Sequence, residues 1–135
     1  HRQAFPIIKT RGTILVFGRA VEGISDGDMY YALSNFSRKE LREQVFTNNS
    51  ELKDRPALQI FLEVEQLYKI IILTENKNIS KFRDMKIEAY SITDFNQIIV
   101  KLSLKYGSKP NCSILSDAPY LIFDFNKTQE EECYV

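Results

Sequence analysis

The sequence predicts an α/β fold, as a single three-layer domain over residues 1–135 with a mainly parallel central sheet. Residues 70–73 are apolar at every position, which is typical of a strand buried on both faces. A short helical pattern and a second strand, 87–92, follow them, and strand, helix and strand in this order predict parallel neighbours. A further apolar run, 13–17, lies between two glycines and predicts another buried strand.

Two helices are predicted after the first strand. The connection over residues 19–28 is rich in glycine and acidic residues, and residues 29–36 and 37–46 suit helices. Ser37 with Glu40 three positions later matches the capping box, in which each side chain bonds to the other residue's backbone amide. Apolar residues at helical spacing give the pair one buried stripe, formed by Leu33, Leu41 and Val45.

Residues 57–68 fit two descriptions. Their apolar positions follow helical spacing, but the run 58–64 also suits a strand. We predict a helix that opens at Pro56, where proline lacks only an amide that a helix leaves unpaired. The segment is also rich in residues that favour helices: Glu63, Glu65 and Gln66.

The polar residues 74–78 predict a loop after the strand 70–73. Asn78 or Ser80 can cap the short helix that follows. The buried residues of that helix recur at every third position: Ile79, Phe82 and Met85. Loops at the carboxyl ends of parallel strands carry the binding sites of such sheets, so this loop is the first candidate for a functional site.

The clearest helix is predicted over residues 93–106, with Thr93 as its N-cap and Gly107 as its C-cap. Further on, 114–115 and 120–125 have the apolar pattern of strands, and Pro119 stands where it costs no ladder hydrogen bond. The acidic residues 129–132 are expected to form a solvated end.

Charge and composition argue against several classes of protein. The 18 basic and 18 acidic residues balance, whereas dedicated nucleic-acid binders usually carry a basic excess. No apolar run approaches the length of a membrane span, so no membrane partner is predicted. The chain starts without an initiator methionine or a signal-peptide pattern, which leads us to expect a domain cut from a longer protein.

Residues for catalysis are scarce. The one histidine, His1, is terminal, so a Ser–His or Cys–His site would need a base from a partner. Two cysteines, Cys112 and Cys133, do not make a zinc site with it. The chain also lacks a glycine-rich phosphate-binding loop. We therefore predict no catalytic residue, no cofactor and no metal.

The two cysteines are expected to be free, buried thiols of an intracellular protein. A secreted domain is the alternative, because five asparagines match the acceptor pattern for N-glycosylation: Asn35, Asn48, Asn78, Asn111 and Asn126.

Some charged residues remain as candidates for a site. Displaced metal ligands would come from four acids, Asp26, Asp28, Glu63 and Glu75, although solvated surface acids are the more common case. Nucleic-acid contacts would come from two small basic faces, one with Arg38, Lys39 and Arg42, the other with Lys77, Lys81, Arg83 and Lys86. Neighbouring acids balance both faces, so nucleic-acid binding is expected to be weak.

Residues 72–79 and 86–95 resemble the C-terminal half of a PIN domain. In that family a strand ends in Leu-Thr-x-Asp, a pair ending in Asn-Leu and a short helix follow, and the next strand leads into a Ser-x-x-x-Phe helix. The corresponding stretches here are Leu73-Thr74-Glu75-Asn76 and Ser91 to Phe95. The likeness covers about a fifth of the chain.

PIN domains are typically metal-dependent ribonucleases that use acids at the strand ends. The family's Asp after the first strand aligns with Gly18, and the Asp of Leu-Thr-x-Asp aligns with Asn76. The resemblance therefore implies a degenerate PIN-like domain that binds protein partners or the rest of a larger polypeptide. It would serve in a nuclear or RNA-processing scaffold, similar to silencing scaffolds of the TASOR type. A ribonuclease with displaced acidic ligands is an alternative.

A BRCT domain is the other alternative. It requires a strand over residues 57–64, and Lys81 would then match the phosphate-binding lysine of a phosphopeptide site. Phe17 stands where that family has Ser or Thr, and the last helix lacks the family's usual Trp.

Overall fold

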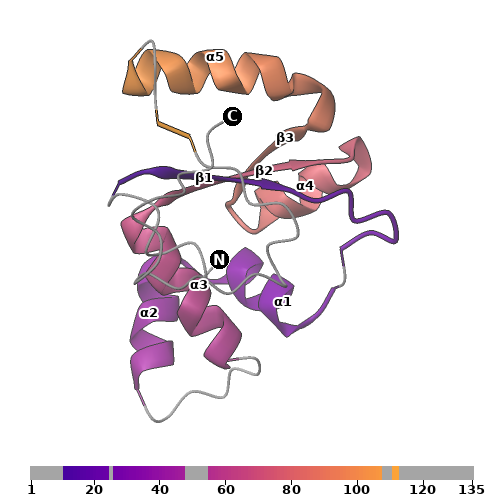
Figure 1. Ribbon diagram of the computed structural model, residues 1–135. Helices are drawn as coiled ribbons and strands as arrows, with labels where there is room; N and C mark the ends of the chain where they lie inside the picture. The colour runs from indigo at the N-terminus through magenta and orange to yellow at the C-terminus, as the bar shows by residue number, and fades with distance from the viewer. Residues whose placement is uncertain (1–10, 25, 48–54, 108–110, 113–135) are drawn as a thin grey trace, which may run out of the picture.

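A computed structural model of the chain describes residues 11–24, 26–47, 55–107 and 111–112. Within these residues a three-stranded parallel sheet, in the order β1-β2-β3, forms the middle layer. Helices α1 to α4 pack on one face of the sheet and α5 packs on the other (Figure 1). The structure thus has the predicted α/β character, with a parallel sheet between two helical layers.

The three strands are β1 (Thr13–Phe17), β2 (Lys69–Thr74) and β3 (Glu88–Ser91). β1 has its predicted bounds, β2 is longer by one residue at each end, and β3 is shorter than the predicted 87–92. β2 pairs in parallel with both neighbours, which confirms the strand–helix–strand unit predicted from the sequence.

The central strand β2 is buried on both faces, as predicted. Ile70 and Ile72 belong to the core under α1 to α4, and Ile71 and Leu73 belong to the core under α5. Successive side chains of a strand point to opposite faces, so an unbroken apolar run serves both layers. None of the four is more than 8% exposed.

The helices before β2 are α1 (Asp28–Asn35), α2 (Arg38–Phe46) and α3 (Arg55–Leu67). The capping box at α2 is confirmed: the Glu40 amide donates to the Ser37 hydroxyl (3.1 Å), and the Ser37 amide donates to the Glu40 carboxylate (2.8 Å). This backbone hydrogen bond from Ser37 lowers the pKa of Glu40. The buried stripe is confirmed as well, since its members are at most 1% exposed: Leu33, Leu41 and Val45. Residues 57–67 are helical, so the helix and not the strand is correct there.

The predicted loop over residues 74–78 is wrong. Thr74 is the last residue of β2, Glu75 is the N-cap residue, and helix α4 (Asn76–Asp84) begins directly after it. Asn78 and Ser80 therefore lie inside the helix and do not cap it. The side chain of Asn78 bonds to another part of the chain, as described below, and a local pattern cannot reveal such a partner.

The predicted cap of the last helix is also wrong. A short 3-10 helix, Ile92–Asp94, comes first, and the Ser91 hydroxyl caps it by accepting a bond from the Thr93 amide (3.3 Å). Helix α5 (Phe95–Tyr106) follows directly. Its predicted end is confirmed, because Gly107 is the C-cap and takes a φ of 95°, a conformation that glycine adopts without strain.

Several other predictions fall outside the described residues, namely the strands 114–115 and 120–125, the acidic end 129–132, and Cys133. Cys112 is described, and it is exposed rather than buried as predicted. No helix in the described part of the chain is long and apolar enough to cross a membrane.

A cluster of charged and polar residues ties the amino ends of β2 and β3 to α5. The Glu88 carboxylate binds the ammonium groups of Lys69 (2.8 Å) and Lys101 (3.3 Å) and accepts a hydrogen bond from the Tyr90 hydroxyl (2.5 Å). Burial raises the pKa of Glu88, but the hydrogen bonds from Lys69, Tyr90 and Lys101 outweigh burial and lower it to about 2, from an ordinary value of 4.5.

Replacing Glu88 by glutamine is therefore expected to change the pH dependence of stability. A carboxylate whose pKa is lowered by folding stabilises the protein fully above its unfolded pKa, and this stability is lost as the pH falls from 4.5 towards 2. We expect Glu88→Gln to lower the free energy of unfolding by about 1–2 kcal/mol at pH 7 and by less at pH 3, because Glu88 is partly exposed. Urea unfolding at several pH values measures this.

The matched control is Glu43→Gln, because Glu43 is exposed on α2. It should leave the unfolding curves almost unchanged. If Glu88→Gln and the parent chain lose stability in parallel between pH 5 and pH 3, the lowered pKa of Glu88 is refuted.

Candidate functional site

The carboxyl ends of β1 and β2 lie side by side. Phe17 is the register partner of Leu73, and the Gly18 amide donates to the Leu73 carbonyl (3.0 Å). Gly18 follows β1 and Asn76 begins α4. The two positions that the predicted PIN resemblance pairs with metal-binding acids therefore both belong to this edge, where parallel sheets place their sites. A Cβ atom at Gly18 would meet nothing within 4 Å, so space alone does not require glycine there.

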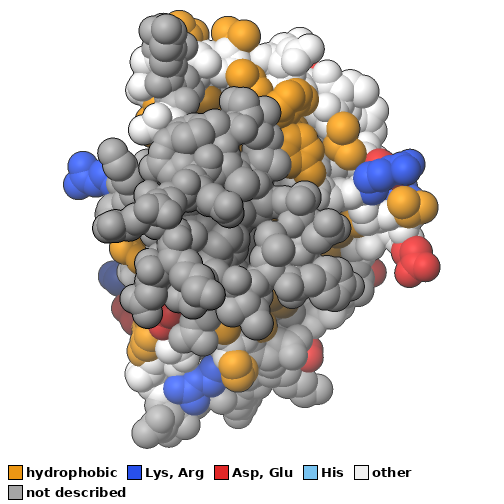
Figure 2. Space-filling model, viewed as in Figure 1, with side chains coloured by type: hydrophobic (Ala, Val, Ile, Leu, Met, Phe, Trp, Pro, Cys, Tyr) orange, Lys and Arg blue, Asp and Glu red, His pale blue; other side chains and the backbone are white. Residues whose placement is uncertain are grey.

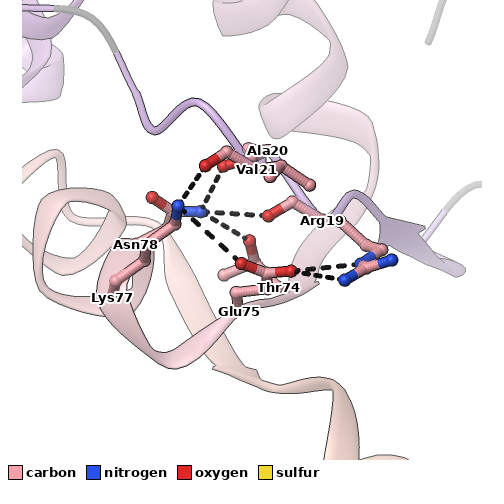
Figure 3. A network of polar contacts seen from close by, with 7 residues as sticks. All are labelled: Arg19, Ala20, Val21, Thr74, Glu75, Lys77 and Asn78. Carbon is pink, nitrogen blue, oxygen red and sulfur yellow. Dashed lines mark hydrogen bonds and ion pairs between the residues drawn. The ribbon is translucent and has the colours of Figure 1, made fainter.

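The side chain of Asn78 lies between the two strand ends (Figure 3). It is only 2% exposed. Its Nδ2 atom donates to the carbonyl oxygens of Arg19 (3.1 Å) and Ala20 (3.0 Å) and lies 3.4 Å from the Thr74 hydroxyl. This one amide therefore fixes the segment after β1 against the start of α4. Backbone carbonyls outside helices and strands need other donors: the Ala20 carbonyl also accepts from the Gly23 amide (2.8 Å), and the Asn78 amide serves both carbonyls.

Two lysines of α4 hold the next part of the same segment. The Lys77 ammonium donates to the Val21 carbonyl. The Lys81 ammonium donates to the Ile24 carbonyl (2.6 Å) and pairs with Asp26 (2.6 Å). Both were predicted as candidate nucleic-acid contacts, and in the structure both bind the protein's own backbone.

The candidate acid at this edge, Glu75, is also paired. Its carboxylate lies 3.0 Å from the Arg19 guanidinium and 3.9 Å from the Lys77 ammonium. A carboxylate held by two cations within the chain is less available to a metal ion, since binding would first have to displace them.

The other three candidate acids lie elsewhere. Asp26 is exposed and pairs with Lys81, Asp28 is exposed in the first turn of α1, and Glu63 accepts a hydrogen bond from Gln59 (3.0 Å). Among the described residues, no three His, Cys, Asp or Glu side chains are grouped closely enough to hold a metal ion. The structure thus does not bring the four acids together as one set of ligands.

The other predicted basic face, formed by Arg38, Lys39 and Arg42, is divided, because Arg38 is bound within the protein. Its Nε atom pairs with Glu65 of α3 (2.8 Å), its Nη2 atom donates to the Met85 carbonyl after α4 (2.7 Å), and its guanidinium lies over the Phe61 ring (5.6 Å). Lys39 is exposed, while Arg42 is half-buried. Arg38 thus links α2 to α3 and to the end of α4, a role that its local sequence does not predict.

The asparagines that match the glycosylation pattern differ in their exposure in the structure. Asn78 is buried and its amide is bonded, so a glycan there is incompatible with this fold. Asn35 and Asn111 are exposed, and Asn35 ends α1 with its amide bonded to the Tyr31 carbonyl (2.9 Å). The remaining two sequons, at Asn48 and Asn126, lie outside the described residues.

Comparisons of the chain with protein-family models, with curated proteins and with solved structures find no match. The PIN-like and BRCT-like resemblances therefore stay predictions. The BRCT-like alternative requires a strand over residues 57–64, and these residues lie within α3.

Proposed function

We propose that the chain is a non-catalytic α/β domain, a degenerate relative of PIN nucleases, that binds a protein partner within a larger scaffold. The observation that supports this proposal is the use of the strand-end side chains for internal contacts. Metal-assisted hydrolysis needs clustered carboxylates with open coordination positions. Here Glu75 pairs with Arg19, and the Asn78 amide fills the gap between the strand ends.

The outer face of α5 is the surface we propose for the partner. Val100 is 60% exposed and Leu104 is 84% exposed, and they lie one turn apart on the same stripe of the helix. Figure 2 shows hydrophobic side chains gathered in the upper part of the molecule, where Figure 1 places α5. Exposed apolar side chains that lie next to one another on a helix can form the apolar centre of a protein interface.

No contact at the strand ends favours either alternative function. A ribonuclease would need acids that lie together, and a phosphopeptide site would need the Lys81 ammonium, which binds Ile24 and Asp26. The nuclear or RNA-processing setting of the scaffold rests on the resemblance alone.

A photo-crosslinking amino acid at position 104 tests the proposed partner surface. In cells that express the protein, we expect Leu104→benzoylphenylalanine to give one discrete protein adduct. Adding Val100→Asp should abolish that adduct, because a charge at the neighbouring position would have to lose its water in an apolar interface.

The same crosslinker at Glu43 serves as the control, because Glu43 is exposed on α2, on the opposite side of the sheet. No adduct from position 104, or the same adducts from both positions, would contradict the proposed surface.

A further inference from the structure

A cavity of about 300 Å³ lies at the amino end of the sheet, at the other end of the strands from the candidate site. Three parts of the chain that are far apart in sequence line it: Arg11, residues 65–69 between α3 and β2, and Lys105 near the end of α5. Its volume is at the lower end of the range for small-ligand sites. The cavity therefore suits a single small group and not a large ligand.

Hydrogen bonds hold these three parts together. The Arg11 amide donates to the Leu67 carbonyl (2.8 Å) and the Lys69 amide donates to the Gly12 carbonyl (3.0 Å), so residues 11–12 lie beside the start of β2. The Tyr106 hydroxyl donates to the Arg11 carbonyl (3.1 Å), which brings the end of α5 to the start of β1 (Figure 1). The walls of the cavity are thus fixed by bonds between described residues.

Arg11 has a backbone conformation that residues other than glycine rarely adopt. Its φ is 69°, in the left-handed region. Such strained residues are often found at binding sites, where the surrounding structure holds them. Both backbone polar groups of Arg11 are bonded here, to Leu67 and to Tyr106. Glycine would take this conformation without strain, so an arginine at this position favours a use for its side chain.

The charges of the lining are positive on balance. Four charged residues line the cavity: Arg11, Glu65, Lys69 and Lys105. Two of them are neutralised by ion pairs, since Glu65 pairs with Arg38 (2.8 Å) and Lys69 pairs with Glu88 (2.8 Å). Arg11 and Lys105 form no ion pair within the described part of the chain. These two cations give the cavity its net charge.

The phenol of Tyr106 responds to this positive charge. Burial raises the pKa of Tyr106, but its hydrogen bonds with Thr13 and Lys105 and the charges of Lys105 and Lys69 outweigh burial and lower it. Helices α3 and α5 both end near the cavity, and a helix C-terminus has a partial negative charge of about half a unit. Two full positive charges outweigh these partial charges, so the cavity favours an anion.

We propose that this cavity binds a phosphate group, held by the Arg11 guanidinium and the Lys105 ammonium. A phosphate monoester carries nearly two negative charges at neutral pH, which matches two cations, whereas a carboxylate carries one. A guanidinium forms two parallel hydrogen bonds to phosphate oxygens, and an ammonium adds a compact charge. This site does not depend on the proposed function, because it lies at the other end of the strands from Gly18 and Asn76.

A titration of the full chain with inorganic phosphate, followed by amide NMR at low salt, tests the proposal. We expect saturable shifts at low millimolar phosphate, confined to the amides around the cavity: Arg11, Leu67, Lys69 and Lys105. Acetate at the same ionic strength should bind about tenfold more weakly, because it offers one charge and fewer acceptors. Shifts that spread over the chain without saturation, or equal binding of acetate, would overturn the proposal.

Three variants separate binding from folding. Arg11→Gly should weaken phosphate binding by about tenfold or more. It should still fold like the parent chain, because glycine takes a positive φ without strain. Lys105→Gln should weaken binding by about threefold to tenfold, and Lys39→Gln, at an exposed position of α2, should leave it unchanged. The proposal fails if Arg11→Gly binds phosphate like the parent chain, or if both lysine variants lose the same affinity.

Two phosphate esters distinguish the sources of the group. Glycerol phosphate represents a free small molecule, and N-acetyl-phosphoserine amide represents a phosphorylated side chain. Shifts at the same amides with either ester support the proposal, and the tighter of the two assigns the source. If inorganic phosphate and both esters leave the amides around the cavity unchanged, the cavity is not a phosphate site.

Discussion

Replacing Asn78 by aspartate is expected to lower the free energy of unfolding by about 3 kcal/mol or more. The Asn78 Nδ2 atom donates to the carbonyl oxygens of Arg19 and Ala20 in a site that is 2% exposed. An ionised aspartate would present an oxygen to both carbonyls and could donate no hydrogen bond. Asn78→Ala should cost less, about 1–3 kcal/mol, because it takes this donor from both carbonyls but adds no charge, and the Ala20 carbonyl keeps its bond from the Gly23 amide (2.8 Å). Urea unfolding measures both variants.

Asn76→Ala is the matched control, because Asn76 is exposed in the first turn of the same helix. Its effect should stay within about 0.5 kcal/mol. If all three variants lose the same free energy of unfolding, the buried amide of Asn78 does not hold the segment after β1. The contacts of Asn78 require the largest loss of stability for Asn78→Asp, a smaller loss for Asn78→Ala and almost none for Asn76→Ala.

Replacing Arg38 by methionine is the second large change, with an expected loss of about 2–4 kcal/mol in the free energy of unfolding. The side chains of Arg38 and Glu65 are only 17% and 24% exposed, and their ion pair measures 2.8 Å. The variant leaves the Glu65 carboxylate and the Met85 carbonyl without this donor. Arg38→Lys should recover part of the loss, since one ammonium cannot reach both acceptors with the geometry of a guanidinium.

Lys39→Met controls for the loss of a positive charge on α2, because Lys39 is the adjacent residue and is exposed. Chemical denaturation of the three variants side by side gives the comparison. If Arg38→Met loses no more stability than Lys39→Met, Arg38 is a surface cation, and the predicted basic face regains its place as a candidate for nucleic-acid contacts.

The elements that could be predicted from the sequence are those with local signals. The strand 13–17 and the run 70–73 are apolar and bounded by glycine or polar residues, and the capping box at Ser37 fixes the start of α2. These signals depend on neighbours in the sequence, which is why burial and hydrogen bonding agree with them.

The side-chain contacts within the candidate site could not be predicted from such local signals. The sequence placed Gly18 and Asn76 at strand ends, but the partners of Asn78 lie 58 and 59 residues away. These long-range bonds draw Asn78 into α4 as a buried donor, although its residue type favours a cap. The same reason hid the role of Arg38, whose acceptor Met85 is 47 residues away.

A manganese titration followed by amide NMR is the most direct test of the central claim, that the strand-end edge is occupied by the chain's own contacts and holds no catalytic metal. The double variant Gly18→Asp/Asn76→Asp serves as comparator, because it places an acid at both positions and a Cβ at Gly18 meets nothing within 4 Å. We expect weak and diffuse broadening in the unmodified chain and local, saturable broadening in the double variant. Saturable broadening confined to Gly18, Glu75 and Asn76 in the unmodified chain would contradict the claim.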